Sequence, residues 1–153
     1  MNLCRDFADL CSLLNANSVD FLIVGGYAVA FHGAPRFTAD LDILIQPTLE
    51  HVGRTLTALK EFGFPAEQIA TQDVLQQRRI LQLGRQPVQI HIMTSISGVD
   101  WDSAWDSRQR GSYGDVPVFF IGRDALVANK RAAGRAKDLA DVEALRPSPN
   151  AGG

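Results

Sequence analysis

The sequence predicts a mixed β-sheet flanked by helices, within the α/β (α+β) class. Short apolar segments typical of buried strands alternate along the chain with segments whose apolar residues recur at helical spacing. Two strand-like segments are separated only by the turn-forming residues 84–87, which indicates a β-hairpin and therefore antiparallel pairing. Interleaved strands and helices together with a hairpin favour a mixed sheet over an all-parallel one.

Length and composition predict one domain. The chain has 153 residues, of which 46% are hydrophobic and 21% charged, enough for a proper core. We expect a single domain over residues 1–146 and a flexible tail over 147–153, where proline and glycine gather. The net charge of −2 gives no overall attraction to nucleic acid, so any such contact would need a local basic patch.

The sequence also predicts a cytoplasmic protein with no membrane partner. Charged residues interrupt the opening segment, so no signal peptide is visible, and no apolar run approaches the roughly 20 residues of a membrane helix. Cys4 and Cys11 are seven positions apart on an expected helix, too far for a disulfide. Two unpaired thiols fit a reducing compartment.

The first half of the chain alternates helices with strands. Apolar residues recur every three or four positions in the opening segment, which predicts an amphipathic helix. Glycine and proline end a short second helix, and Thr48 is a plausible N-cap for a third. The expected elements are a helix over 2–16, a strand over 20–24, a helix over 27–32, a strand over 40–45 and a helix from Thr48 to about Phe62.

The second half is expected to contain the hairpin and two C-terminal helices. Residues 66–77 are ambiguous, with a short helix over 73–76 as one interpretation, and residues 100–108 fit either a short helix or an irregular loop. Gly134 separates two helical segments near the end of the chain. The remaining elements are strands over 79–83, 88–93 and 116–121, and helices over 123–133 and 136–145.

Two aspartates mark the strand over 40–45. Asp40 and Asp42 are two positions apart, so on a strand both side chains point to the same face. The flanking residues are apolar, and burying two carboxylates there is costly unless a cation neutralises them. Mg²⁺ favours one or two carboxylates together with substrate phosphates. Asp40 and Asp42 are therefore predicted metal ligands and catalytic residues, with a turn or cap pair at a strand edge as the structural alternative.

Gly25 and Gly26 stand where the first strand ends and the next helix begins. Glycines at such a junction let backbone N–H groups approach a phosphate, and the helix N-terminus adds partial positive charge. They are predicted nucleotide-binding residues, and a simple strand-to-helix turn is the alternative. The G-x-G-x-x-G spacing of a dinucleotide-binding fold is absent.

These motifs together resemble a known signature. Gly25-Gly26 followed by Arg36-x-Thr38-x-Asp40-x-Asp42 resembles the DNA polymerase β-like nucleotidyltransferase superfamily. The likeness is greatest to the small bacterial branch that includes stand-alone minimal nucleotidyltransferases and toxins of toxin–antitoxin pairs. The C-terminal segment Asn129-Lys130-Arg131, then Gly134-Arg135-x-Lys137-Asp138-x-x-Asp141, resembles the C-terminal helices of the same group. The resemblance runs from about Val19 to Leu145.

The resemblance implies a nucleotidyltransferase fold and a metal-dependent enzyme that moves an NMP from an NTP onto a hydroxyl group. Mg²⁺ is the implied cofactor, with Mn²⁺ as the alternative. RNA, a protein or a small molecule would be the acceptor, and a toxin would have a cognate antitoxin or other partner protein. Arg36, Thr38, Lys130 and Lys137 are implied nucleotide-binding residues, although Lys137 also fits a surface ion pair with Asp141 four residues on.

His91 departs from the resemblance, because it stands where the superfamily usually supplies a third carboxylate. It fits a catalytic base that accepts a proton from the attacking hydroxyl, or a ligand for a softer ion such as Mn²⁺ or Zn²⁺. It also fits a degenerate site, in which case the chain is a nucleotide- or partner-binding module without catalysis. A core histidine bonded to a backbone carbonyl is the fourth interpretation.

Overall fold

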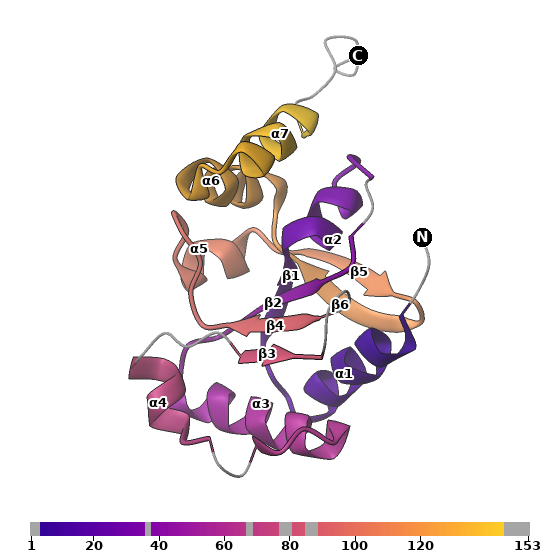
Figure 1. The fold of residues 1–153 in the computed structure, drawn as a ribbon, viewed down its shortest axis with the longest axis vertical. Coiled ribbons are helices and arrows are strands. Elements are labelled where there is room, and N and C mark those ends of the chain that lie inside the picture. Colours follow the sequence, from indigo (N-terminus) through magenta and orange to yellow (C-terminus); the bar gives the residue numbers. More distant parts are fainter. Residues whose placement is uncertain (1–3, 36–37, 67–68, 77–80, 85–88, 146–153) are drawn as a thin grey trace.

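The computed structural model describes residues 4–35, 38–66, 69–76, 81–84 and 89–145. Helices and strands alternate along most of the chain, and the strands form one sheet (Figure 1). In chain order they are α1 (Arg5–Ala16), β1 (Phe21–Val24), α2 (Gly25–Phe31), β2 (Leu41–Ile45), α3 (Leu49–Phe62), α4 (Thr71–Gln76), β3 (Leu81–Leu83), β4 (Ile90–Met93), α5 (Trp101–Asp106), β5 (Gln109–Tyr113), β6 (Val116–Phe120), α6 (Arg123–Ala133) and α7 (Ala136–Ala144).

The sheet is mixed, as the sequence predicts. Its strand order is β3-β4-β2-β1-β6-β5. β1 pairs with β2 antiparallel and with β6 parallel, whereas β4 lies parallel to β2. The antiparallel pairing of β3 with β4 confirms the predicted hairpin, although residues 85–87 of its turn and residues 79–80 and 88 of its strands lie outside the described part of the chain. β1 and β2 are therefore central strands, and the C-terminal end of β1 lies beside the N-terminal end of β2, where Val24 is opposite Asp42.

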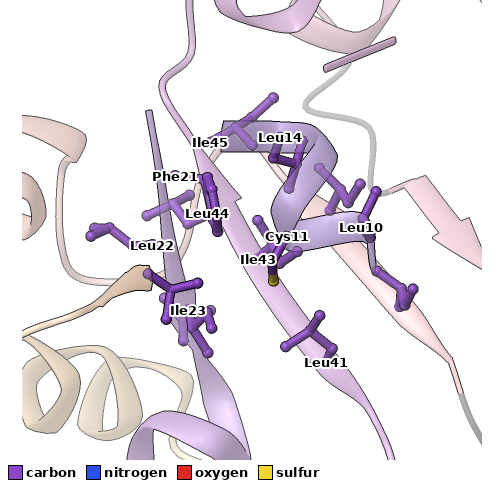
Figure 2. Close-up of a cluster of buried hydrophobic side chains, with 14 of the residues drawn as sticks. Leu10, Cys11, Leu14, Phe21, Leu22, Ile23, Leu41, Ile43, Leu44 and Ile45 are labelled. Carbon is purple, nitrogen blue, oxygen red and sulfur yellow. The ribbon is translucent and has the colours of Figure 1, made fainter. Parts of the chain in front are cut away.

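The core explains why the two central strands lack polar–apolar alternation. All four residues of β1 are buried, and in β2 every residue but Asp42 is buried. Helices α1, α3 and α4 lie to one side of the sheet in Figure 1 and α6 and α7 to the other, so both faces of a central strand are covered. Leu10, Cys11 and Leu14 of α1 belong to the same hydrophobic core as the residues of β1 and β2 (Figure 2). Each fully buried aliphatic side chain contributes roughly 1.5–3 kcal/mol.

Local signals fix the ends of several helices. The hydroxyl of Thr48 accepts a hydrogen bond from the backbone N–H of His51 at 3.1 Å, which confirms the expected N-cap of α3. Gly134 adopts a left-handed conformation between α6 and α7 and separates them as predicted. The cysteines are free, with Cys11 buried, and no membrane-length apolar helix occurs within the described ranges.

One expectation about the elements is wrong, one open alternative is decided, and one strand was missed. The second helix begins at Gly25, directly after β1, rather than at residue 27, so both glycines belong to its first turn. Of the two interpretations of residues 100–108, the short helix is confirmed: α5 spans Trp101–Asp106, and its N-cap Asp100 accepts a hydrogen bond from the N–H of Ser103 at 2.7 Å. The edge strand β5 was not predicted, because its sequence Gln-Arg-Gly-Ser-Tyr is polar and mostly exposed. Its strand character comes from pairing with β6 rather than from local preference.

Candidate active site

A cavity of about 550 Å³ is lined by residues of the central part of the sheet and of the C-terminal helices. It brings together residues from β1, β2, β4, the loop after β4, α6 and α7, which are far apart in the sequence. Six predicted site residues line it: Gly25, Asp40, Asp42, His91, Lys130 and Lys137. Gly26 is buried in the first turn of α2 and is not among the lining residues, and Thr38 donates a hydrogen bond to the carbonyl of Asp40 at 3.2 Å. Arg36 lies outside the described residues.

Asp40 and Asp42 form the acidic wall of the cavity. Asp40 immediately precedes β2, and its Oδ1 accepts a hydrogen bond from the backbone N–H of Gln89 at 3.1 Å. Asp42 lies within β2 opposite Val24 of β1, and its side chain is 26% exposed. The predicted shared face of the two carboxylates is therefore a shared cavity wall, as the period of the strand requires.

Gly25 allows this wall to form. Its φ angle is +67°, a left-handed conformation that side chains disfavour. A Cβ atom placed on Gly25 would lie only 2.1 Å from Oδ2 of Asp42. The backbone of α2 thus approaches the Asp42 carboxylate so closely that any side chain at this position would displace it.

His91 contacts Asp42 directly across the parallel strands β2 and β4, where the two residues are paired in register. Nδ1 of His91 lies 2.8 Å from Oδ1 of Asp42, and Nε2 lies 3.3 Å from Oε1 of Gln89. The His91 side chain is 25% exposed and lines the cavity. Its contacts within the described chain are thus with side chains at a cavity, which does not fit a core histidine bonded to a backbone carbonyl.

The donor set of the acidic wall fits a single divalent cation better than two. Asp40 and Asp42 would hold one Mg²⁺ or Mn²⁺ together with the phosphates of a bound nucleotide. Within the described part of the chain, no group of three or more His, Cys, Asp or Glu side chains is placed to hold a metal ion. A third protein ligand, which a second cation would need, is thus lacking there.

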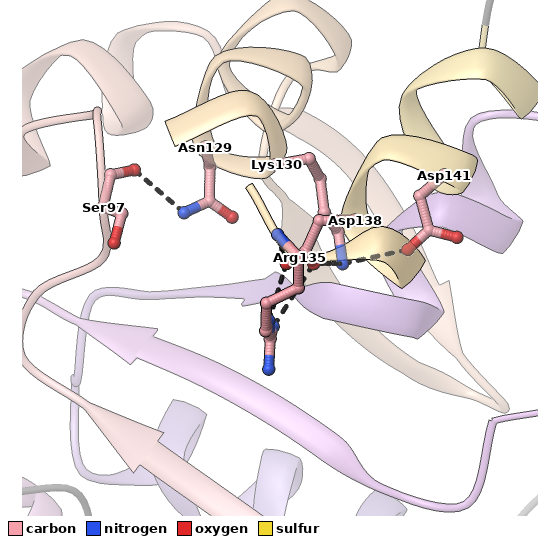
Figure 3. Close-up of polar contacts among 6 residues, drawn as sticks. All are labelled: Ser97, Asn129, Lys130, Arg135, Asp138 and Asp141. Atoms are coloured by element: carbon pink, nitrogen blue, oxygen red, sulfur yellow. Dashed lines mark hydrogen bonds and ion pairs between the residues drawn. The ribbon is translucent and has the colours of Figure 1, made fainter. Parts of the chain in front are cut away.

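The opposite wall of the cavity is built from charged residues of α6, α7 and the turn between them (Figure 3). This basic wall contains Lys130, Arg135, Lys137 and Asp138. Nζ of Lys130 lies 3.3 Å from Asp138 and 3.1 Å from Asp141, and all three side chains are at most 8% exposed. Burial would raise the pKa of Asp138, but hydrogen bonds from Arg135 and Lys130 outweigh it, so the pKa lies below its ordinary value. Lys130 is therefore engaged in a buried ion-pair network while it borders the cavity.

Arg135 joins this network from the cavity side. Its Nε and Nη2 donate to the two carboxylate oxygens of Asp138 at 2.6 and 3.2 Å, while the arginine side chain stays 62% exposed. The pKa of Arg135 is raised chiefly by its hydrogen bond to Asp138, and the negative charges of Asp138 and Asp42 add to that effect. The guanidinium is thus fixed in place and lies within electrostatic reach of the acidic wall.

Lys137 lies at the exposed rim of the cavity. The acid four residues on, Asp141, is buried and directs Oδ2 at Lys130. On the remaining side, Ser95, Ile96 and Ser97 of the loop after β4 complete the lining. Asn129 of α6 donates a hydrogen bond to the carbonyl of Ser97 at 2.9 Å, which ties this loop to the basic wall (Figure 3).

Sequence reasoning included Arg135 in the C-terminal motif but missed its pairing with Asp138 and the role of Asn129 in holding the loop. The spacing Arg135-x-x-Asp138 at the start of a helix was the available signal, because residues three apart on a helix face each other. The contacts Lys130–Asp138 and Asn129–Ser97 depend on how α6 packs, which local sequence does not encode.

Comparison of the sequence with protein-family profiles and with curated proteins finds no match. The fold, however, is similar to solved structures. The lincosamide antibiotic adenylyltransferase LnuA, solved with lincomycin bound, has a TM-score of 0.58 at 14% identity, over 95% of this chain and 98% of that chain. An antigenic nucleotidyltransferase-like protein from Paracoccidioides brasiliensis has a TM-score of 0.55 at 16% identity, over 92% of this chain and 74% of that one.

The chain therefore has the nucleotidyltransferase fold, a mixed sheet flanked by helices. At these identities the likeness concerns architecture. The predicted chemistry depends on the residues that this chain itself places in the cavity.

Proposed function

We propose that this protein is a metal-dependent nucleotidyltransferase that moves an NMP from an NTP onto a hydroxyl group of an acceptor. The observation that carries the proposal is the two-walled cavity: Asp40 and Asp42 on one side face the cationic side chains of α6–α7 on the other. A cation held by carboxylates and a cationic wall are the two kinds of charge that an NTP requires. The nucleotidyltransferase fold of the similar structures supports the same class of reaction.

The reaction is a substitution at the α-phosphorus. The acceptor hydroxyl oxygen forms a bond to that phosphorus, the bond to the bridging oxygen breaks, and pyrophosphate leaves with the electron pair. The hydroxyl proton must go to a base, and His91 is suited to take it. With Nδ1–H donated to Asp42 at 2.8 Å, the lone pair is on Nε2, which takes the proton once the amide oxygen of Gln89, 3.3 Å away, has turned from it. Asp42 orients the ring, as a carboxylate does in other histidine-based sites.

The cation would be Mg²⁺ or Mn²⁺, held by Asp40 and Asp42. When bound, it neutralises phosphate oxygens on which negative charge builds during transfer. Gly25 and Gly26 would offer backbone N–H groups to the phosphates at the first turn of α2. The basic wall would stabilise the leaving pyrophosphate.

The acceptor can be RNA, a protein or a small molecule. The similar protein LnuA is described as a lincosamide antibiotic adenylyltransferase, which supports including small hydroxyl compounds. A toxin that modifies RNA or protein, paired with an antitoxin, is the alternative physiological role, and the sequence motifs are its support.

The test is a transfer assay with each of the four NTPs labelled at the α-phosphate. The native protein and Asp42→Asn are incubated with Mg²⁺ or Mn²⁺ and with total RNA, a protein lysate or a set of hydroxylated small molecules. We expect label in one acceptor class with the native protein and none with the variant. Label that appears equally with Asp42→Asn would overturn the proposal.

A second candidate is a nucleotide- or partner-binding module without catalysis. The observation that favours it is the imidazole of His91 in place of a third carboxylate, with no three-ligand cluster in the described ranges. Under this alternative the native protein binds NTP but transfers nothing, and His91→Asp restores metal-dependent transfer.

A further inference from the structure

Two of the cations in the basic wall, Lys130 and Arg135, differ in their availability to a ligand. Lys130 is 8% exposed, and its ammonium lies 3.3 and 3.1 Å from the carboxylates of Asp138 and Asp141. A lysine with two anionic partners has little charge left to offer a third, and releasing it would cost each of two buried carboxylates an ion pair. Lys130, which the sequence motif predicts to bind nucleotide, is therefore less suited to bind a phosphate than Arg135.

Arg135 has the opposite character. Its side chain is 62% exposed and lines the cavity, and only two of its five N–H donors go to Asp138. The remaining donors are free to meet an incoming anion, and the planar guanidinium suits phosphate geometry.

Asp138 holds Arg135 in this position. The aspartate side chain is 1% exposed and receives hydrogen bonds from three groups of Arg135, namely N, Nε and Nη2, and one from Lys130. Because Lys130 also fixes Asp138 from the interior, the carboxylate cannot swing away when an anion draws on the arginine. The guanidinium is thus pre-organised, which reduces the entropy lost when a ligand binds.

From these contacts we propose that Arg135, rather than Lys130, binds the β- and γ-phosphates of the nucleotide, and that Asp138, held by Lys130, is the positioning residue for Arg135. The ligand class is a polyphosphate chain. Lys137, exposed at the same cavity rim, adds a second cation. This inference rests on the proposed function, because it names the phosphate-binding part of the same site.

The test measures binding of inorganic tripolyphosphate with Mg²⁺ by calorimetry, which avoids any dependence on the base. The proteins are the native chain, Arg135→Gln, Asp138→Asn and the double variant. Arg131→Gln is the matched control, since Arg131 is exposed near the end of α6 and does not line the cavity. Asp138→Asn leaves Lys130 its partner Asp141, so the variant should fold, and thermal unfolding checks this.

We expect Arg135→Gln to weaken tripolyphosphate binding by about 10- to 100-fold, as loss of a charge-assisted contact does. Asp138→Asn should weaken it by a smaller factor and add nothing in the double variant, because it acts through Arg135. A merely structural role of Asp138 would instead give additive losses. Arg131→Gln should bind like the native protein.

The outcomes separate this inference from the proposed function. If the native protein binds NTP through Asp40 and Asp42 but Arg135→Gln binds tripolyphosphate as tightly as the native chain, the inference alone is overturned. Additive losses in the double variant overturn the positioning role of Asp138. If the folded native protein binds neither tripolyphosphate nor any NTP, both the inference and the proposed function are overturned.

Discussion

His91 and Asp42 face each other across two parallel strands, with Nδ1 2.8 Å from Oδ1. The contact joins the predicted metal-binding carboxylate to the residue that departs from the superfamily pattern. It gives the histidine a defined orientation at the cavity.

Replacing His91 by Gln removes the proton acceptor but keeps a polar side chain of similar length. We expect the transfer rate to fall about 100-fold or more while NTP affinity stays within a factor of about three, since general bases contribute at this level. Single-turnover transfer and calorimetry measure the two quantities. A matched variant, His91→Asp, supplies the missing carboxylate. If His91→Asp transfers faster than the native protein with Mg²⁺, the histidine is an impairment rather than a base.

Substituting Gly25 with Ala should displace the Asp42 carboxylate, because the new Cβ would lie 2.1 Å from Oδ2. Gly33→Ala is the matched control: φ is +100° there, but a Cβ would have no neighbour within 4 Å. Both variants should lose about 1–2 kcal/mol of stability from the left-handed backbone. Only Gly25→Ala should lose metal-dependent NTP binding. Equal NTP binding by the two variants would contradict the close approach of α2 to Asp42.

The buried carboxylate of Asp138 should contribute to stability in a pH-dependent way. Its pKa is lowered in the folded protein, so the contribution is complete above the ordinary value of 3.8 and is lost as pH falls through the lowered folded value. At pH 7, Asp138→Asn should cost about 2 kcal/mol in the free energy of unfolding.

Urea unfolding between pH 7 and pH 3 checks this prediction. The stability gap between the native chain and Asp138→Asn should stay constant down to about pH 5 and narrow below pH 4. Asp9→Asn, on the exposed side of α1, is the control and should show no such gap. A gap that widens toward low pH would have the wrong sign for this network.

Cys11 should be inert in the folded protein. It is fully buried in the core, and burial raises the pKa of its thiol to about 12, so almost no thiolate exists at pH 8. In a Cys4→Ser background, a thiol reagent at pH 8 should label the protein only after denaturant is added. Labelling of the native variant at the rate of a free cysteine would contradict the packing of α1 against the sheet.

The strands that carry the site were predictable because burial left a clear pattern. The apolar run of β1 indicates a buried strand. The Asp-x-Asp spacing of β2 also predicts that the two carboxylates share one face of the strand. β5 was not predictable, because an edge strand forms through pairing with its neighbour, here β6. The pairing of Lys130 with Asp138 and Asp141 was also out of reach, since it depends on the packing of α6 against α7.

The central claim is that the cavity binds an NTP through a cation held by Asp40 and Asp42. Calorimetric titration of the native protein and of Asp40→Asn/Asp42→Asn with each NTP, in Mg²⁺ and then in Mn²⁺, tests it most directly. We predict binding of at least one NTP that requires the cation and disappears in the double variant. Absence of binding by any of the four NTPs to the folded native protein, or binding unchanged in the double variant, would contradict the claim.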